Sequence, residues 1–188
     1  MSRSDQPIIR MARAEDAAAI QRIYAPFVRD TAITFETVAP TEAEILDRLT
    51  ATLPTLPWLV AETDGNVLAY AYASRHHTRA AYRWSVDVSV YVDPVRHRRG
   101  IGRALYLPLL DRLRRQGFYT AYAAITLPNE ASVGLHETLG FQPLCVFRHV
   151  GYKLGDWRDV GYWQLELRPA DGVPPEPGAV DDEAPDRT

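Results

Sequence analysis

The sequence predicts a single mixed α/β domain with a largely antiparallel sheet. Apolar runs of strand type alternate along the chain with segments of helical periodicity. Asp64-Gly65 stands between two strand-like runs and is a strong signal for a β-hairpin turn. Gly117 and Gly140 stand where two helical patterns stop, as expected after a helix C-terminus. The chain has 188 residues, of which 46% are hydrophobic, so it can bury the core of one domain.

Four helices are predicted from apolar spacing and from their end signals. Apolar residues at i, i+3, i+4 and i+7 predict a helix over Asp16–Arg29. Asn129 is suited to the N-cap of the last helix, because its side chain can accept a backbone N–H. The other helices are expected over Glu42–Leu53, from a basic loop to about Gln116, and over Asn129–Leu139.

Seven strands are predicted from short apolar runs bounded by turn residues. Several of these runs are rich in valine and aromatic residues, which are enriched in strands. The expected strands cover Ile8–Met11, Trp58–Glu62, Val67–Ser74, Trp84–Val92, Tyr119–Thr126, Cys145–Tyr152 and Asp159–Leu167.

The C-terminal segment from Pro169 differs in composition from the rest of the chain. It reads PADGVPPEPGAVDDEAPDRT, with five prolines and no aromatic residue. Such a segment buries too little apolar surface to offset its ordering entropy. The net charge is −3 in total and −5 from Asp171 to Thr188, which leaves +2 for the remainder. We therefore expect one domain over residues 1–168 and a disordered acidic tail over 169–188.

Composition also excludes several classes of protein. The net charge of −3 gives no indication of nucleic-acid binding. Cys145 is the only cysteine, so neither an intrachain disulfide nor a cysteine-based zinc site can form. No apolar run approaches the ~20 residues that span a bilayer, and the N-terminus lacks a signal peptide, so a cytoplasmic protein is expected. No metal is implied, because His76 and His77 are adjacent and are expected to point apart.

The segment VYVDPVRHRRGIGRALYLPLL carries the strongest chemical signal. A valine-rich strand leads into a loop with Gly100 and Gly102, where a helix begins among four arginines. A helix N-terminus offers about half a positive charge and free N–H donors, and nearby arginines add bidentate donors. This combination of donors suits a pyrophosphate. An ordinary turn that contains glycine, next to a solvent-exposed basic surface, would give the same sequence pattern. A P-loop is excluded because Arg103 follows Gly102, and the dinucleotide fingerprint because Leu105 replaces its third glycine.

The segment His97-Arg98-Arg99-Gly100-Ile101-Gly102 resembles motif A of the GNAT acetyltransferase superfamily, with His97 in place of the usual glutamine or arginine. LPNEASVGLHETLGF resembles its motif B. Together with GYKLGDWRDVGYWQ, PWLVAETDG and AYRWSVDVSVYV, that string closely resembles the phosphinothricin N-acetyltransferase family, over roughly Ile8 to Leu167.

The resemblance implies the GNAT fold, a mixed and mostly antiparallel sheet with helices on both faces. It implies acetyl-CoA as co-substrate, no metal, and a homodimer. Members acetylate the free amine of phosphinothricin, and some prefer methionine sulfoximine or sulfone. The cofactor-binding residues that it implies are Val90, Tyr91, Val92, Arg98, Arg99, Gly100, Ile101, Gly102, Arg103, Asn129 and Ser132.

The resemblance also implies roles at the reacting groups. Asp87 aligns with a glutamate that is the proposed general base, and being one methylene shorter it acts either directly or through a water; a solvent-facing carboxylate is the plainer alternative. His136 stands where many relatives have a general-acid tyrosine; it either serves as acid, helps to hold the substrate, or is structural. Phe35, Arg79 and Tyr82 match substrate-binding positions, and Arg79 has the right fork for a carboxylate or phosphinate.

Two other functions stay open from the sequence. One is acetylation of a protein N-terminus or lysine, and the other is a non-catalytic acetyl-CoA-binding module. Release of thiol in the presence of an added amino-acid amine would distinguish an enzyme from a binding module.

Overall fold

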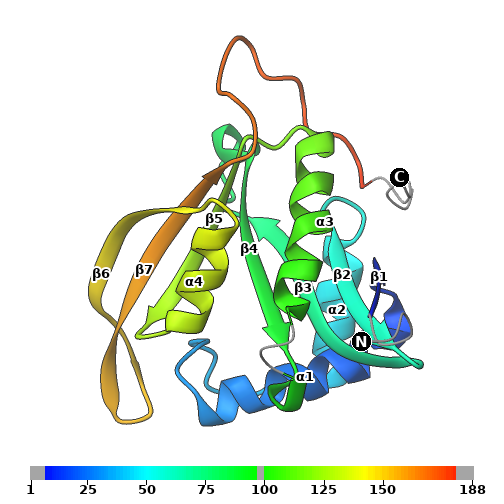
Figure 1. Cartoon of the computed structure of the whole chain (residues 1–188), viewed down its shortest axis with the longest axis vertical. Coiled ribbons are helices and arrows are strands. Elements are labelled where there is room, and N and C mark those ends of the chain that lie inside the picture. The colour runs from blue at the N-terminus through cyan, green and yellow to red at the C-terminus, as the bar shows by residue number, and fades with distance from the viewer. Residues whose placement is uncertain (1–6, 97–99, 181–188) are drawn as a thin grey trace.

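The computed structural model describes residues 7–96 and 100–180 and contains one seven-stranded sheet (Figure 1). The strand order is β1-β2-β3-β4-β5-β7-β6, and every neighbouring pair is antiparallel except β4 and β5. This confirms the predicted mixed, largely antiparallel sheet. The strands are β1 (Ile8–Met11), β2 (Trp58–Thr63), β3 (Asn66–Arg75), β4 (Ser85–Val92), β5 (Thr120–Leu127), β6 (Gln142–Lys153) and β7 (Asp156–Glu166).

Helices cover both faces of this sheet, as expected. A core on one face gathers side chains of α3 against the central strands, and a second core on the other face gathers side chains of α1 and α2. The helices are α1 (Ala17–Asp30), α2 (Glu42–Thr52), α3 (Ile101–Gln116) and α4 (Glu130–Thr138), with short 3-10 turns η2 (Ala14–Asp16), η3 (Ala80–Tyr82) and η4 (Pro94–Arg96).

Local turn and cap chemistry agrees with the sequence. Asp64 and Gly65 have φ of 50° and 75°, the left-handed conformation that a two-residue hairpin turn requires. Asn129 Oδ1 accepts a hydrogen bond from the Ser132 N–H at 3.2 Å and so caps α4. Gly117 ends α3 with φ of 93°. All three predictions are confirmed. They could be made from the sequence because each feature depends only on neighbouring residues.

The last two strands are longer than predicted. β6 and β7 pair from Gln142 to Lys153, with a two-residue turn at Leu154-Gly155. The sequence pattern missed their ends because β6 is an edge strand with most side chains exposed, so burial imposes little alternation on it.

Strand β4 presents different side chains to the two faces of the sheet. Val86 and Val88 are buried in the core on the α3 face, while Tyr91 packs with the core on the α1 face. Because successive side chains alternate, Asp87 and Ser89 share the face of Tyr91. This alternation places a carboxylate on the sheet surface that α1 and α2 cover only in part.

Strands β4 and β5 pair over only part of their length. Their parallel pairing covers Ser85–Asp87 against Thr120–Tyr122 and then ends, although both strands continue. In the described strands, the β5-facing edge of Ser89 and Val90 therefore has no strand partner. The two strands diverge beyond Asp87 and leave an opening between them.

The described part of the C-terminal segment runs back along the domain to Val180 (Figure 1). The Trp84 indole N–H donates to the Pro175 carbonyl at 2.7 Å, and Arg83 pairs with Glu176 at 2.7 Å. The Gly178 N–H donates to the Gln116 carbonyl at 2.7 Å. The disorder of residues 169–188 stays a prediction, which truncation can test.

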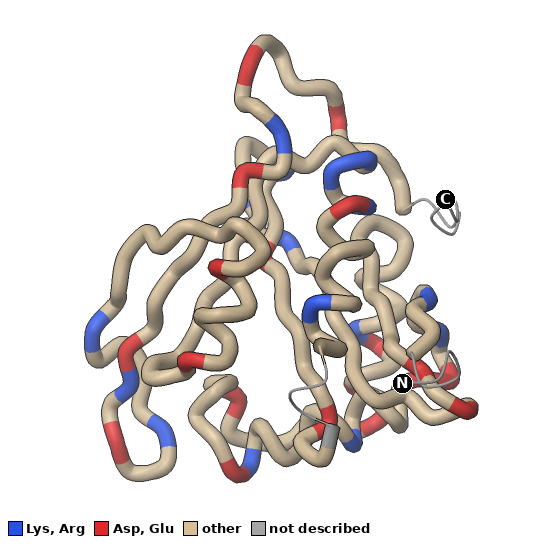
Figure 2. Tube along the Cα trace, viewed as in Figure 1, with Lys and Arg blue, Asp and Glu red and all other residues tan. Residues whose placement is uncertain are grey.

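Charges of both signs are spread over all parts of the trace rather than gathered on one side (Figure 2). Within the described residues, no helix has both the length and the apolarity that a bilayer crossing requires.

Candidate active site

The first turn of α3 faces a cavity of about 470 Å³. Gly100 precedes the helix with φ of 74°, and a Cβ added there would meet no atom within 4 Å, so its backbone borders open space. The N–H groups of a first helical turn have no acceptor within the helix. The cavity also touches Gly102 and Arg103. The described part of the predicted anion-binding segment, from Gly100 onward, thus borders this cavity.

The same cavity extends between β4 and α4. Its walls come from strand β4, the α3 N-terminus and the N-terminal turns of α4. The predicted cofactor residues that line it are Val90, Tyr91, Val92, Gly100, Ile101, Gly102, Arg103, Asn129 and Ser132. Arg98 and Arg99 lie outside the described residues. Nine of the eleven predicted positions therefore border one cavity, although they come from three separate elements.

A smaller hollow of about 50 Å³ occupies the opening between β4 and β5. It shares Val90, Tyr91, Asn129 and Ser132 with the larger cavity, so the two adjoin. Val88 and Ser89, which directly follow Asp87 on β4, line it as well. The smaller hollow thus lies between the larger cavity and the part of β4 that follows Asp87.

Asp87 lies at the point where β4 and β5 separate. Its side chain is 38% exposed, and its Oδ1 lies 2.8 Å from His76 Nδ1. Burial raises the pKa of the Asp87 carboxyl, and the hydrogen bond from His76 opposes that rise. A carboxylate of this kind can accept a proton more readily than a fully solvated one.

His76 and His77 do not point apart, contrary to the expectation from sequence. Their ring centroids are 4.4 Å apart in an edge contact, and both rings contact Tyr82. The reason is that β3 ends at Arg75, so strand alternation no longer governs the two histidines. Sequence reasoning missed His76, because no local signal shows that it lies opposite Asp87.

His136 is buried on α4 and uses both ring nitrogens. Nδ1 lies 2.7 Å from the Ser132 carbonyl, and Nε2 lies 3.0 Å from the Tyr106 hydroxyl. A carbonyl only accepts, so Nδ1 carries the hydrogen and Nε2 accepts from Tyr106. Burial lowers the pKa of His136, which therefore stays neutral near pH 7. Tyr106, which sequence reasoning missed, lines the smaller hollow together with His136.

Phe35 lies in the loop after α1 and packs against β6. Its ring occupies the space that a side chain at Gly151 would need. The Lys153 ammonium donates to the Thr34 carbonyl at 2.7 Å and holds the same loop on the hairpin. Gly151 is thus required by the close approach of this loop. Phe35 is 38% exposed beside it.

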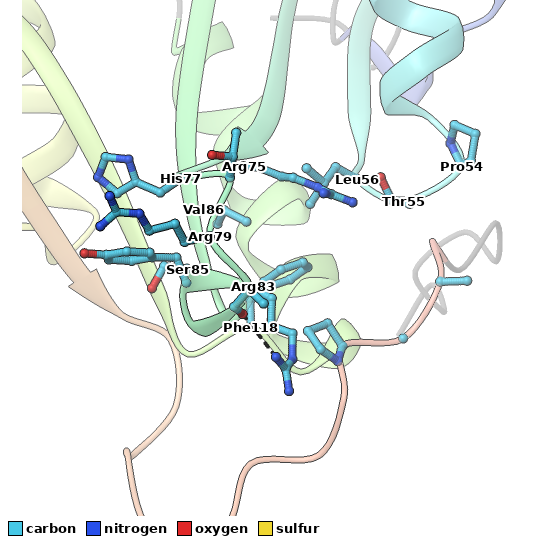
Figure 3. A pocket seen from close by; sticks show the side chains of 16 residues that line it. Pro54, Thr55, Leu56, Arg75, His77, Arg79, Arg83, Ser85, Val86 and Phe118 are labelled. Carbon is cyan, nitrogen blue, oxygen red and sulfur yellow. Dashed lines mark hydrogen bonds between the residues drawn. The ribbon is translucent and has the colours of Figure 1, made fainter.

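Arg79 and Tyr82 line a different cavity from the predicted cofactor residues. This cavity of about 540 Å³ lies at the end of the sheet, with Val86 and Phe118 in its wall. In Figure 3, His77 and Arg79 lie on one side of it and Pro54 and Leu56 on the other. The structure does not bring Arg79 into direct contact with Asp87. Tyr82 contacts the ring of His76, the hydrogen-bond partner of Asp87, with 6.0 Å between the ring centroids.

Within residues 7–96 and 100–180, no group of three or more histidine, cysteine or acidic side chains is placed to hold a metal ion.

Comparison with known proteins gives a consistent result. A family profile described as "Acetyltransferase (GNAT) domain" matches residues 9–161. Phosphinothricin N-acetyltransferase of Streptomyces viridochromogenes is 41% identical over 179 residues, which are 94% of this chain and 96% of that protein. L-Methionine sulfoximine/L-methionine sulfone acetyltransferase of Salmonella typhimurium is 36% identical over 160 residues, which are 85% of this chain and 94% of that protein.

A solved structure shares the fold at similar identity. It is a GNAT superfamily phosphinothricin acetyltransferase from Sinorhizobium meliloti, crystallised in complex with acetyl-CoA. It superimposes with a TM-score of 0.88 at 34% identity, covering 94% of this chain and 97% of that chain.

Proposed function

This chain belongs to the GNAT family of acetyltransferases, and we propose that it transfers the acetyl group of acetyl-CoA to the free amine of a small amino-acid-like substrate. The observation that carries the proposal is the continuity of the site. The cavity at the α3 N-terminus adjoins the hollow between β4 and β5, and Val88 and Ser89, which directly follow Asp87, line that hollow. This arrangement supports a cofactor groove at the α3 N-terminus with the proposed base close to its inner end.

The residues of the larger cavity fit acetyl-CoA. The α3 N-terminus and Arg103 would hold the pyrophosphate, because N–H groups and a guanidinium both favour an anion. The open edge of β4 at Val90 would pair with the pantetheine amides as a neighbouring strand does. Acetyl-CoA supplies an acetyl thioester, and Asn129 and Ser132 border the path toward Asp87.

Asp87 is the proposed general base. The amine of a free amino acid is mostly protonated at neutral pH and cannot attack until it loses a proton. Asp87 takes this proton, directly or through a water, and the freed lone pair on nitrogen forms the new C–N bond. The C–S bond of the thioester then breaks, and the departing thiolate takes up the second proton that the nitrogen loses. Phe35, Arg79 and Tyr82 stay the proposed substrate-binding residues. For His136 the proposed roles stay acid, substrate contact or structural residue, and its bonds to Ser132 and Tyr106 favour the structural role.

Phosphinothricin, methionine sulfoximine and methionine sulfone are the proposed acceptor type, because two relatives that align over most of this chain are named for them. The test is a thiol-release screen with these compounds, the common amino acids, and peptides that carry a free N-terminus or lysine. We expect turnover with at least one small amino-acid analogue and none with the peptides. Turnover with peptides alone would instead assign the chain to protein acetylation.

A melting curve separates a binding module from an enzyme. Acetyl-CoA at 100 times its dissociation constant should stabilise the fold by about 2.7 kcal/mol, or about 5–10 °C for a chain of this size. Stabilisation without thiol release on any amine would identify a non-catalytic acetyl-CoA-binding module. An unchanged melting temperature in millimolar acetyl-CoA would contradict the proposed cofactor site.

The homodimer is also a proposal, and the β6–β7 hairpin supports it. β6 is an edge strand, and an edge strand can pair antiparallel with its own copy about a two-fold axis. Seven large apolar side chains around this hairpin are at least 44% exposed, which forms an unusual apolar surface. They are Leu144, Val146, Phe147, Val150, Tyr152, Leu154 and Trp157.

Light scattering after gel filtration tests the dimer. Trp157→Glu should convert dimer to monomer, because it places a charge within the proposed apolar interface. Ile8→Glu is the matched control, since Ile8 is 67% exposed on β1 at the opposite edge of the sheet. A monomeric unmodified protein, or dissociation by Ile8→Glu alone, would overturn this interface.

A further inference from the structure

Asp87 has one hydrogen-bond partner among the described residues, and that partner is His76. Oδ1 of Asp87 lies 2.8 Å from Nδ1 of His76, whereas Oδ2 makes no hydrogen bond to any described side chain or backbone group. An ionised carboxylate can only accept, so Nδ1 of His76 carries the hydrogen and donates it. One oxygen of the base is thus held while the other is left for the substrate.

The His76 ring is itself held in place. It stacks on Tyr122 with a centroid distance of 4.3 Å and an interplanar angle of 20°. Tyr122 stands directly opposite Asp87 in the parallel register of β4 and β5. His77 contacts the His76 ring from another direction. The side chain of His76 is only 19% exposed. The imidazole therefore has little freedom to leave the carboxylate.

We propose that His76 is a positioning residue for the reaction: its Nδ1–H holds Oδ1 of Asp87 and leaves Oδ2 directed to the acceptor amine. This inference rests on the proposed function, in which Asp87 is the base. The proton itself moves from the amine nitrogen to Oδ2, and His76 neither gains nor loses one in that step. Its contribution is the orientation of the carboxylate and the stabilisation of its ionised form.

The pH dependence follows from the groups around this pair. Burial raises the pKa of Asp87, and the hydrogen bond from His76 lowers it, with a smaller effect from the charge of His77. Burial also raises the pKa of the phenols on Tyr72, Tyr122 and Tyr162, so these groups stay neutral where Asp87 titrates. The titratable groups near the pair are His77, Tyr72, Tyr82, Tyr122 and Tyr162.

Two substitutions of His76 separate the hydrogen bond from the ring. His76→Phe keeps a ring to stack on Tyr122 but removes the donor. It should lower kcat by about 10- to 100-fold, the effect of losing a hydrogen bond to a charged group. A base works only when ionised, so the acid limb of the kcat profile should move to higher pH by about one unit. His76→Asn places an amide N–H near the position of Nδ1 and should recover most of the loss.

The KM for acetyl-CoA should stay unchanged in both variants, because His76 lies outside the cofactor cavity. His77→Phe is the matched control: it removes the neighbouring histidine, which has no hydrogen bond to Asp87. Its acid limb should move less than that of His76→Phe, because no hydrogen bond to Asp87 is lost.

The outcomes distinguish this inference from the function on which it rests. An unchanged kcat and pH profile in His76→Phe would overturn the positioning role. Loss of activity in Asp87→Asn would at the same time still support Asp87 as the general base. A loss in His76→Phe that His76→Asn does not repair would also overturn it, since the ring rather than the donor would then matter. No thiol release from the unmodified protein on any amine would instead overturn the proposed function.

Discussion

Asp87 combines partial burial with a single well-placed hydrogen bond. Burial raises the pKa of its carboxyl, while the hydrogen bond from His76 lowers it and stabilises the ionised form. A base is most effective when its pKa lies near the working pH, because it must be ionised and still bind a proton. The contact with His76 therefore opposes the rise in pKa that burial causes and favours the ionised form that a base requires.

Replacement of this carboxylate should slow the chemical step. Asp87→Asn should lower kcat by ~10²–10⁴-fold, the usual contribution of general-base catalysis. The loss should shrink as pH rises from 6 to 10, because more amine then arrives deprotonated. The KM for acetyl-CoA should hardly change, since Asp87 does not line the larger cavity.

Asp87→Glu is the conservative comparison. It should keep activity or raise it, because it introduces the glutamate that aligns with this position in the phosphinothricin N-acetyltransferase family. Near-full activity of Asp87→Asn at every pH would show that another group, or solvent, removes the proton.

The first turn of α3 packs closely on α4, and this packing shapes the cofactor groove. A Cβ at Gly102 would lie 3.2 Å from Leu135 Cδ2 on α4 and 3.9 Å from Val90 and Val92 on β4. Any side chain at this position must therefore displace the Leu135 side chain or narrow the groove. Gly102 is required by close approach, whereas Gly100 is required by its positive φ.

Gly102→Val should raise the KM for acetyl-CoA far more than the KM for the amine. The substitution disturbs the loop proposed to bind the pyrophosphate, away from the reacting atoms. Gly134→Val is the matched control, because it lies on α4 where an added Cβ meets no atom within 4 Å. Steady-state kinetics in both substrates measures the effect, and equal changes in the two KM values would show that the loop is not a dedicated cofactor site.

The chain beyond β7 touches the domain at few points. Arg83 and Glu176 are 42% and 70% exposed, so solvent screens their ion pair. Gln116 is buried, but its side-chain N–H groups reach both Gly178 and Thr55, so one partner stays after loss of the tail. These contacts are too few and too exposed to hold the fold together.

Truncation after Arg168 should therefore leave kcat intact and cost about 1 kcal/mol of stability, or about 2–4 °C in Tm. Calorimetry and thiol release on the truncated protein measure both. Glu176→Gln in the full chain isolates the ion pair and should change Tm by less. A large loss of activity or folding on truncation would show that the segment belongs to the domain, and would contradict the predicted disordered tail.

Sequence alone determined those features that depend on neighbouring residues. The turn at Asp64-Gly65, the cap at Asn129 and the stop at Gly117 were predictable because each depends on local backbone chemistry. The glycine loop before α3 likewise predicted an anion site, and cavity-lining residues from β4 and α4 followed from the family resemblance. The mixed sheet followed from the order of these local signals.

Tertiary structure alone decided which distant residues meet. His76 faces Asp87 because β3 stops at Arg75, and Tyr122 supports that ring because β4 and β5 share a register there. Arg79 borders a separate cavity, although the resemblance groups it with Asp87. Where a strand ends and where two strands diverge depend on packing across the whole sheet, and no local pattern in the sequence reports this.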